Sequence, residues 1–284
     1  MLLLPIWMSL ASIVLAIGVG SRYGHRLHDR GVTLSGKLRL REAPLIPVCM
    51  LAFVALIVVS QAVMSRPSIT WRLPLFVEYW LLPFLWALRL MLVTFAASAV
   101  TTIAMLGKSK YRFVLLFACT IVVLTVEGAT RYASQPRLPE LHDWERDGVI
   151  IQSSGVTCAP AACANIARSL GVEKTEREMA RALQTNWLGT SPSQMVYGMR
   201  SLGFSARRVV IPSCDVREVK PPAILSVDHG GQVGGHAVAY MGMEGEHCVI
   251  INPNAGRQIL SVDMIKKSWR GHAIEISRED DTAS

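Results

Sequence analysis

The C-terminal half of the sequence contains four residues whose side-chain chemistry suits the hydrolysis of a peptide bond by a thiol. Cys158 lies where a helix is expected to begin, and there the unpaired N–H groups and the helix dipole lower a thiol's pKa. His236 opens an expected strand after a glycine-rich run, and Asn252 ends the next strand. Gln152 lies in a loop six residues before Cys158. Together they offer a nucleophile, a base, a group that orients the base and an amide donor for an oxyanion.

The elements that must position these residues change character along this half of the chain. Helix signals come first: Thr157 precedes the Cys158 segment, and capping-box spacing begins at Thr175 and again at Ser191, where Pro192 follows. After Gly203, six short β-branched or alternating runs predict strands, at 205–211, 223–227, 236–241, 248–251, 258–262 and 273–276. Helices followed by strands favour an α+β domain over a parallel α/β sheet.

The segment from Gln152 to Ala162 resembles the Gln…Cys-Gly-Pro-Ala segment of the bacteriocin-processing cysteine peptidases, which cleave double-glycine leader peptides. The resemblance covers about residues 148–277 and continues through Gly189-Thr190-Ser191, Gly235-His236-Ala237-Val238, Ile251-Asn252-Pro253 and Trp269-Arg270-Gly271. It implies a papain-like fold with N-terminal helices and a C-terminal antiparallel sheet. It also implies Cys158 as nucleophile and His236 as base. Asn252 would orient the base, and Gln152 would donate to the oxyanion.

Two positions depart from that family's pattern. Asn252 stands where the family usually has Asp, and Thr157-Cys158-Ala159 replaces Asp-Cys-Gly. Papain-like enzymes elsewhere use Asn to orient the base, so the departure is compatible with catalysis. No ATPase region follows in this sequence, and we therefore expect neither nucleotide binding nor export. Cleavage after a double glycine is implied by the resemblance alone.

The N-terminal half is far more apolar. A helix needs roughly 20 mostly apolar residues to cross a bilayer core, and four stretches are predicted to do so by this criterion. They are 2–20, 45–64, 86–106 within the longer run 75–106, and 113–126. We therefore expect a transmembrane region of about four helices at 1–130, a polar linker at 131–147 and the peptidase domain at 148–284. Arg89 is interpreted as snorkelling at the membrane edge, with a transport path as the alternative.

Charge follows the same division. Residues 1–147 carry 15 Lys and Arg against 8 Asp and Glu, whereas residues 148–284 carry 14 against 13. A folded domain that is nearly neutral argues against a nucleic-acid partner. The basic residues gather between the first and second and between the third and fourth apolar stretches, so these loops are expected to face the cytoplasm. The prediction is an integral protein of a bacterial cell membrane with the lipid bilayer as partner and the peptidase domain outward.

The rival hypothesis is a peptidase-like domain that binds leader-like peptides without cutting them. The complete set of catalytic residue types favours an endopeptidase that acts on a peptide or protein substrate. No Cys-x-x-Cys or His-x-x-x-His spacing is present, so neither a metal nor another cofactor is expected. Three other cysteines are interpreted as structural, with a disulfide between two of them left open: Cys163, Cys214 and Cys248. Three histidines are interpreted as surface or turn residues: His229, His247 and His272.

Overall fold

A computed structural model describes residues 3–32, 44–64, 70–106, 141, 144–186, 189–229 and 232–278. The chain divides into two compact units. One consists of Met1–Val63 and Trp80–Tyr132, and the other of Met64–Tyr79 and Ala133–Ser284. The C-terminal unit therefore includes a segment that precedes the third apolar stretch, which the sequence-based boundaries leave in the transmembrane region.

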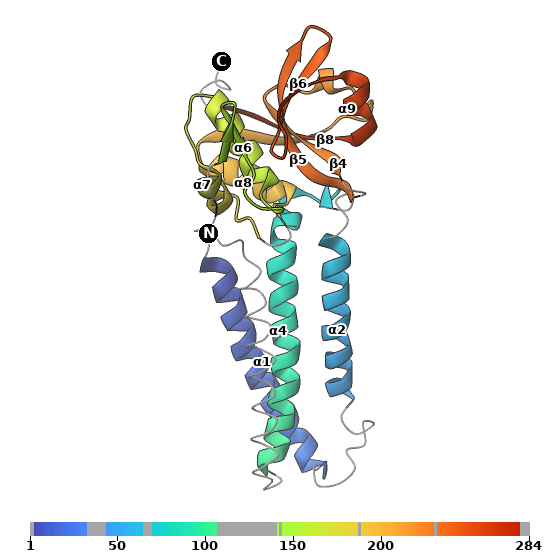
Figure 1. The fold of residues 1–284 in the computed structure, drawn as a ribbon. Coiled ribbons are helices and arrows are strands. Elements are labelled where there is room, and N and C mark those ends of the chain that lie inside the picture. Colours follow the sequence, from blue (N-terminus) through green and yellow to red (C-terminus); the bar gives the residue numbers. More distant parts are fainter. Residues whose placement is uncertain are drawn as a thin grey trace. The chain divides into compact units, whose positions relative to one another are not determined.

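Three helices lie where the first three apolar stretches predict them: α1 (Leu3–Asp29), α2 (Leu45–Met64) and α4 (Leu75–Leu106), drawn in blue to green in Figure 1. Within the described part of the chain, α4 alone combines the length and the apolar composition that a membrane crossing requires. The fourth predicted stretch, 113–126, lies outside the described residues. The number of spans and their orientation stay predictions.

Glycines on α1 allow its backbone to approach α4 closely. A Cβ atom added at Gly20 would lie 2.6 Å from the carbonyl oxygen of Phe95, and one added at Gly24 would lie 2.6 Å from that of Ala99. These glycines are four residues apart and so share one face of the helix. Small residues at this spacing are typical of helix pairs in membranes, where close backbone packing drives association.

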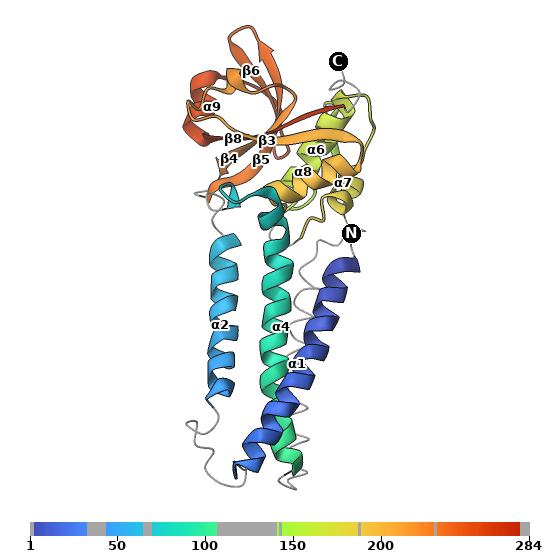
Figure 2. The same cartoon turned by 180° about the vertical axis from the view of Figure 1, so that it is seen from behind.

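The C-terminal unit is an α+β domain, as predicted. Its sheet is antiparallel, with six strands in the order β3-β8-β4-β5-β6-β7. The strands are β3 (Phe204–Val210), β4 (Ala223–His229), β5 (Gln232–Glu244), β6 (His247–Asn252), β7 (Gly256–Ser261) and β8 (Trp269–Arg278). The helices are α6 (Cys158–Ser169), α7 (Glu176–Ala182) and α8 (Pro192–Ser201). Figures 1 and 2 show these three helices gathered on one side of the strands.

Local signals account for the ends of the helices. Thr175 and Glu178 form the predicted capping box of α7, and Ser191 and Gln194 form that of α8, with Pro192 in the first turn. Gly171 and Gly203 follow α6 and α8 with φ of 79° and 83°, a conformation that glycine adopts without strain.

Four elements were not predicted: α9 (Val262–Ser268), the 3₁₀ helix η2 (Val216–Glu218), β1 (Trp144–Arg146) and β2 (Val149–Ile151). The linker prediction is wrong for residues 144–146, which pair with 149–151 as an antiparallel hairpin. All three residues of β1 are exposed, so the strand has no apolar alternation that could signal it. Its pairing with the buried β2 supplies the backbone partners instead.

Two apolar cores cover the two faces of the sheet. Ala237 and Ala239 of β5 belong to the core that also contains the alanine-rich α6, whereas Val238 and Tyr240 belong to a second core around Trp269. This alternation is the two-residue period of a strand buried on both faces. The alanines of α6 keep the helix close to β5, and this approach positions the site described next.

Candidate active site

Cys158 is the first residue of α6 and is half-buried, in the position that the sequence predicts. The neighbouring residue Ala159 is buried in the core together with Ala237 of β5. Backbone N–H groups of Ala237, Ala159 and Cys158 itself lie close enough to the thiol to lower its pKa. Since Ala237 directly follows His236, the packing of α6 on β5 brings the thiol beside the backbone of the candidate base.

The thiol's pKa differs from the sequence-based expectation. Burial raises the pKa of Cys158 above its ordinary value, and the surrounding N–H groups, which lower the pKa, offset only part of this effect. The prediction of a lowered pKa at the helix start is therefore wrong for the unliganded chain. Desolvation by burial outweighs the backbone N–H groups near the thiol.

His236 is buried, with 5% of its surface exposed. Burial lowers the pKa of the imidazole, the hydrogen bond with Asn252 raises it, and the nearby His229 lowers it further, for a net decrease. The ring centroids of His229 and His236 are 5.0 Å apart. The pKa shifts of Cys158 and His236 both favour a neutral thiol with a neutral imidazole over a thiolate with an imidazolium.

The predicted proximity of His236 and Asn252 is confirmed. Nε2 of His236 lies 2.9 Å from Oδ1 of Asn252, across the neighbouring strands β5 and β6. The same oxygen accepts the backbone N–H of Asn254 at 3.0 Å, which identifies it as the acceptor end of the carboxamide. Nε2 of the histidine must then donate, so the neutral ring keeps its lone pair on Nδ1. Nδ1 is the nitrogen that can accept a proton from a thiol.

Gln152 follows β2 and is tied to the turn that carries Asn252. Its backbone N–H donates to the carbonyl oxygen of Pro253 at 2.9 Å. Its side-chain Nε2 donates to the carbonyl oxygen of Ser154 at 3.0 Å, and its Oε1 is buried without a hydrogen-bond partner among the described residues. One of the two hydrogens on Nε2 is therefore used by Ser154, and the second remains for another acceptor.

A buried carboxylate fixes the loop between Gln152 and Cys158. Glu176, which is fully buried, accepts the backbone N–H of Ser153 at 3.0 Å and its hydroxyl at 2.6 Å. Within the same loop, Thr157 Oγ1 accepts the N–H of Ser154 at 3.1 Å and donates to its carbonyl oxygen at 2.9 Å. The loop before the nucleophile is thus held by side chains as well as by its own backbone.

Asn165 joins β2 to α6 beneath this loop. Its Oδ1 accepts the N–H of Ile150, and its Nδ2 donates to the carbonyl oxygens of Ile150 and Ala161, each at 2.9 Å. Sequence reasoning missed both Asn165 and Glu176. Glu176 lies in the first turn of α7 beside the capping-box residue Glu178, and nothing in the local pattern distinguishes the buried glutamate from the exposed one.

The remaining cysteines and histidines also differ in part from expectation. All five described cysteines are free, including Cys163, Cys214 and Cys248. His272 lies in β8 and not in a turn; it is half-buried, and its ring stacks on Trp71. Within the described ranges, no three His, Cys, Asp or Glu residues are grouped so that they could hold a metal ion.

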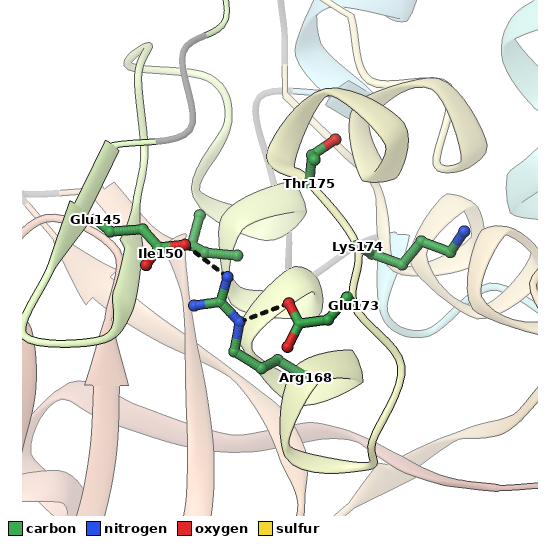
Figure 3. Close-up of a pocket in the computed structure, with 6 residues that line it drawn as sticks. All are labelled: Glu145, Ile150, Arg168, Glu173, Lys174 and Thr175. Carbon is green, nitrogen blue, oxygen red and sulfur yellow. Dashed lines mark hydrogen bonds and ion pairs between the residues drawn. The ribbon is translucent and has the colours of Figure 1, made fainter.

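A small pocket of about 150 Å³ lies near the other end of α6 (Figure 3). There Arg168 bonds to Glu145 at 2.6 Å and to Glu173 at 3.0 Å, as the dashed lines in Figure 3 mark. Arg168 comes ten residues after Cys158 on the helix, which is about 15 Å along its axis. This pocket is therefore separate from the candidate active site.

Comparison with known families supplies a match for the C-terminal half. The model of the peptidase C39 family matches residues 146–281. An uncharacterized protein of Methanothermobacter marburgensis is 32% identical over 136 residues, which are 48% of this chain and 92% of that protein. An uncharacterized protein of Methanothermobacter thermautotrophicus is 28% identical over 133 residues, 47% of this chain and 90% of its own.

Two solved structures are similar to the same region. One is a double glycine motif protease from an AMS/PCAT transporter in complex with the leader peptide, with 17% identity and a TM-score of 0.42. It matches 46% of this chain and 90% of its own. The other is the peptidase domain of Streptococcus ComA, a bi-functional ABC transporter involved in quorum sensing, with 22% identity and a TM-score of 0.42. It matches 46% of this chain and 98% of its own.

Proposed function

The chain belongs to the peptidase C39 family, and from this premise we propose that it is a membrane-anchored cysteine endopeptidase that cleaves a peptide or leader-peptide bond. Cys158 is the nucleophile and His236 the base. Asn252 orients the base, and Gln152 donates to the oxyanion. The observation that supports this assignment most is the 2.9 Å contact between His236 Nε2 and Asn252 Oδ1, which leaves Nδ1 as the basic nitrogen.

The first half-reaction forms a thioester. Nδ1 of His236 takes the thiol proton as the sulfur of Cys158 attacks the substrate carbonyl, and the carbonyl electron pair moves to the oxygen. The free hydrogen on Gln152 Nε2 donates to this oxyanion. When the intermediate collapses, the C–N bond breaks and the leaving amine takes the proton from His236.

The second half-reaction returns the enzyme to its starting state. His236 takes a proton from water as the oxygen attacks the thioester carbonyl. The C–S bond then breaks, and the sulfur of Cys158 recovers the proton. Each half-reaction needs a neutral imidazole at its start, and the lowered pKa of His236 keeps the ring neutral over a wider range of pH.

The substrate class and the location are part of the same proposal. We extend to this chain the leader peptide named for the AMS/PCAT protease, and with it cleavage after a double glycine. The apolar helix α4 supports anchoring in a cell membrane, with about four helices within residues 1–130 as the transmembrane region, apart from the segment before Trp80 that belongs to the C-terminal unit. Residues 131–143 connect this region to a peptidase domain that begins with the β1–β2 hairpin and faces outward.

The test uses membranes that contain the full chain and a panel of leader-peptide fusions with and without a double glycine. We expect cleavage by the parent chain, no cleavage by Cys158→Ala, and retention of the protein in the membrane after alkaline carbonate washing. A chain that binds these fusions equally well before and after Cys158→Ala, and cleaves none of them, would instead be the peptide-binding module. Release by carbonate would refute the membrane anchor while leaving the peptidase assignment intact.

A further inference from the structure

Residues 70–79 belong to the C-terminal unit, although about 65 residues separate them from the beginning of β1 in the sequence. Thr70, Trp71 and Glu78 are buried, with 5%, 4% and 7% of their surfaces exposed. Phe76 and Val77, which are apolar, are exposed. The segment thus buries the acidic Glu78 while its apolar neighbours are exposed. A buried carboxylate without partners is strongly disfavoured, so Glu78 must have specific partners.

Arg208 of β3 supplies the main partner. Its Nη1 donates to Oε2 of Glu78 at 3.0 Å and to the carbonyl oxygen of Thr70 at 3.3 Å, and its Nη2 donates to the carbonyl oxygen of Leu73. The guanidinium also lies over the ring of Trp71, 5.6 Å from its centroid. The side chains of Glu78 and Arg208 are only 3% and 14% exposed. Arg208 therefore contacts residues 70–79 near both of their ends, at Thr70 and Glu78, and between them at Leu73.

The adjacent strand β8 provides a second contact. The rings of Trp71 and His272 are stacked, with centroids 4.7 Å apart and planes inclined by 14°. In the register of β3 and β8, Arg208 pairs with Ile274 and Val210 pairs with His272. Arg208 and His272 are thus diagonal neighbours on one face of the sheet, and Trp71 contacts both.

The beginning of α8 provides a third contact. The other oxygen of Glu78, Oε1, accepts the backbone N–H of Ser193 at 3.4 Å. The hydroxyl of Tyr79 accepts a hydrogen bond from Nε2 of Gln184 at 3.1 Å. The rings of Tyr79 and Tyr197 pack edge-on, with centroids 4.9 Å apart. Glu78 therefore brings a negative charge to the first turn of α8, where unpaired N–H groups favour one.

We infer that the face formed by Tyr197, Arg208 and His272 is a docking site for residues 70–79 of the same chain, which complete the peptidase domain and hold the first turn of α8. This inference is independent of the proposed function, since it concerns the assembly of the domain and holds whether or not the chain cleaves peptides. It assigns to Glu78 a structural role in the domain, as the ion-pair partner of Arg208.

Hydrogen exchange of the full chain in detergent, read by mass spectrometry, tests the docking. Arg208→Gln removes the charge at the centre of the site, and Arg207→Gln is the matched control. Arg207 is the preceding residue of β3, is 71% exposed at its side chain and pairs with Glu275 instead. In Arg208→Gln we expect exchange at least about tenfold faster in peptides that cover 70–79 and 192–196, and parent-like exchange there in Arg207→Gln.

Trp71→Ala is the second variant, because it weakens docking without leaving a buried charge unpaired and so tests the site even if Arg208→Gln does not fold. It should accelerate exchange in the same two regions. Parent-like exchange at 70–79 in Trp71→Ala would overturn the inference. An increase spread evenly over β4, β5 and β6 would also overturn it, because it would indicate general destabilisation and not release of a docked segment.

Discussion

The side-chain Nδ2 of Asn252 donates a hydrogen bond to Oε1 of Gln258 at 3.3 Å, across the paired strands β6 and β7. This contact and the N–H of Asn254 hold the two ends of the Asn252 carboxamide in one orientation. The orientation matters because it presents oxygen, and not NH₂, to Nε2 of His236. Gln258 therefore acts on the candidate base through Asn252, as a positioning residue.

Removing this acceptor should weaken turnover without removing any of the four proposed catalytic groups. Gln258→Leu is expected to lower kcat roughly tenfold, which corresponds to about 1.4 kcal/mol, near the value of one hydrogen bond. Gln258→Glu keeps an acceptor for Nδ2 of Asn252 and should retain most of the activity. Steady-state cleavage of a leader-peptide substrate measures both variants. Equal kcat values for Gln258→Leu and Gln258→Glu would contradict the positioning role.

Asn252→Asp should move the acid limb of the pH profile upward. A carboxylate beside the ring stabilises the imidazolium, so the pKa of His236 should rise from its lowered value in the parent chain. For the parent we expect kcat/KM to fall only below about pH 6.5, the ordinary pKa of histidine. The measurement is kcat/KM against pH for both proteins. An acid limb at the same pH in Asn252→Asp would show that residue 252 does not face the titrating group.

The labelling of Cys158 by iodoacetamide should increase steadily with pH, because only the thiolate reacts and burial raises the pKa of this thiol. No plateau of fast labelling is expected near neutral pH. Peptide mapping after short exposure gives the rate for each cysteine. A pH-independent rate between about pH 5 and 8 would instead identify a resting thiolate–imidazolium pair and refute the neutral pair inferred from the two pKa shifts.

Gln152→Ala should separate catalysis from thiol reactivity. A donor to the oxyanion acts on charge that is complete only in the transition state, so its loss is expected to lower kcat by about 10²–10³. KM and the alkylation rate of Cys158 should stay close to those of the parent, because the backbone N–H of Gln152 still bonds to Pro253. Gln152→Glu, which places a negative charge near the oxyanion, should be no more active. Turnover within a few-fold of the parent would remove Gln152 from the mechanism.

In the N-terminal unit, Gly24→Ala should destabilise the pair of helices α1 and α4. The added Cβ would lie 2.6 Å from the carbonyl oxygen of Ala99 and 2.8 Å from Cβ of Thr102, so the backbones must separate. Gly18→Ala is the matched control, because a Cβ there meets no atom within 4 Å. Thermal unfolding in detergent should show a loss of about 1–3 kcal/mol for Gly24→Ala, as for other overpacked sites. A loss of the same size in Gly18→Ala would contradict the steric explanation, because Ala at an uncrowded helical position should stabilise the helix relative to Gly.

The helix ends of the C-terminal domain could be predicted from the sequence, because they depend on local interactions. The capping boxes at Thr175 and Ser191 and the glycines after α6 and α8 depend on atoms only a few residues apart, so each segment carries its own signal. The contact of His236 with Asn252 was also foreseeable, because a short connection brings the adjacent antiparallel strands β5 and β6 side by side. The family match to residues 146–281 agrees with the motif that these segments form.

The electrostatics of the site and the limits of its domain depended on the tertiary structure. The pKa of Cys158 reflects a balance between backbone N–H groups, one of them from β5, and burial against a core assembled from distant segments. Glu78 and Arg208 form an ion pair across 130 residues, and Ser153 bonds to Glu176 across 23. Burial and long-range pairing arise only when separate segments pack together, so no local pattern could encode which glutamates are buried or whether the thiol rests as a thiolate.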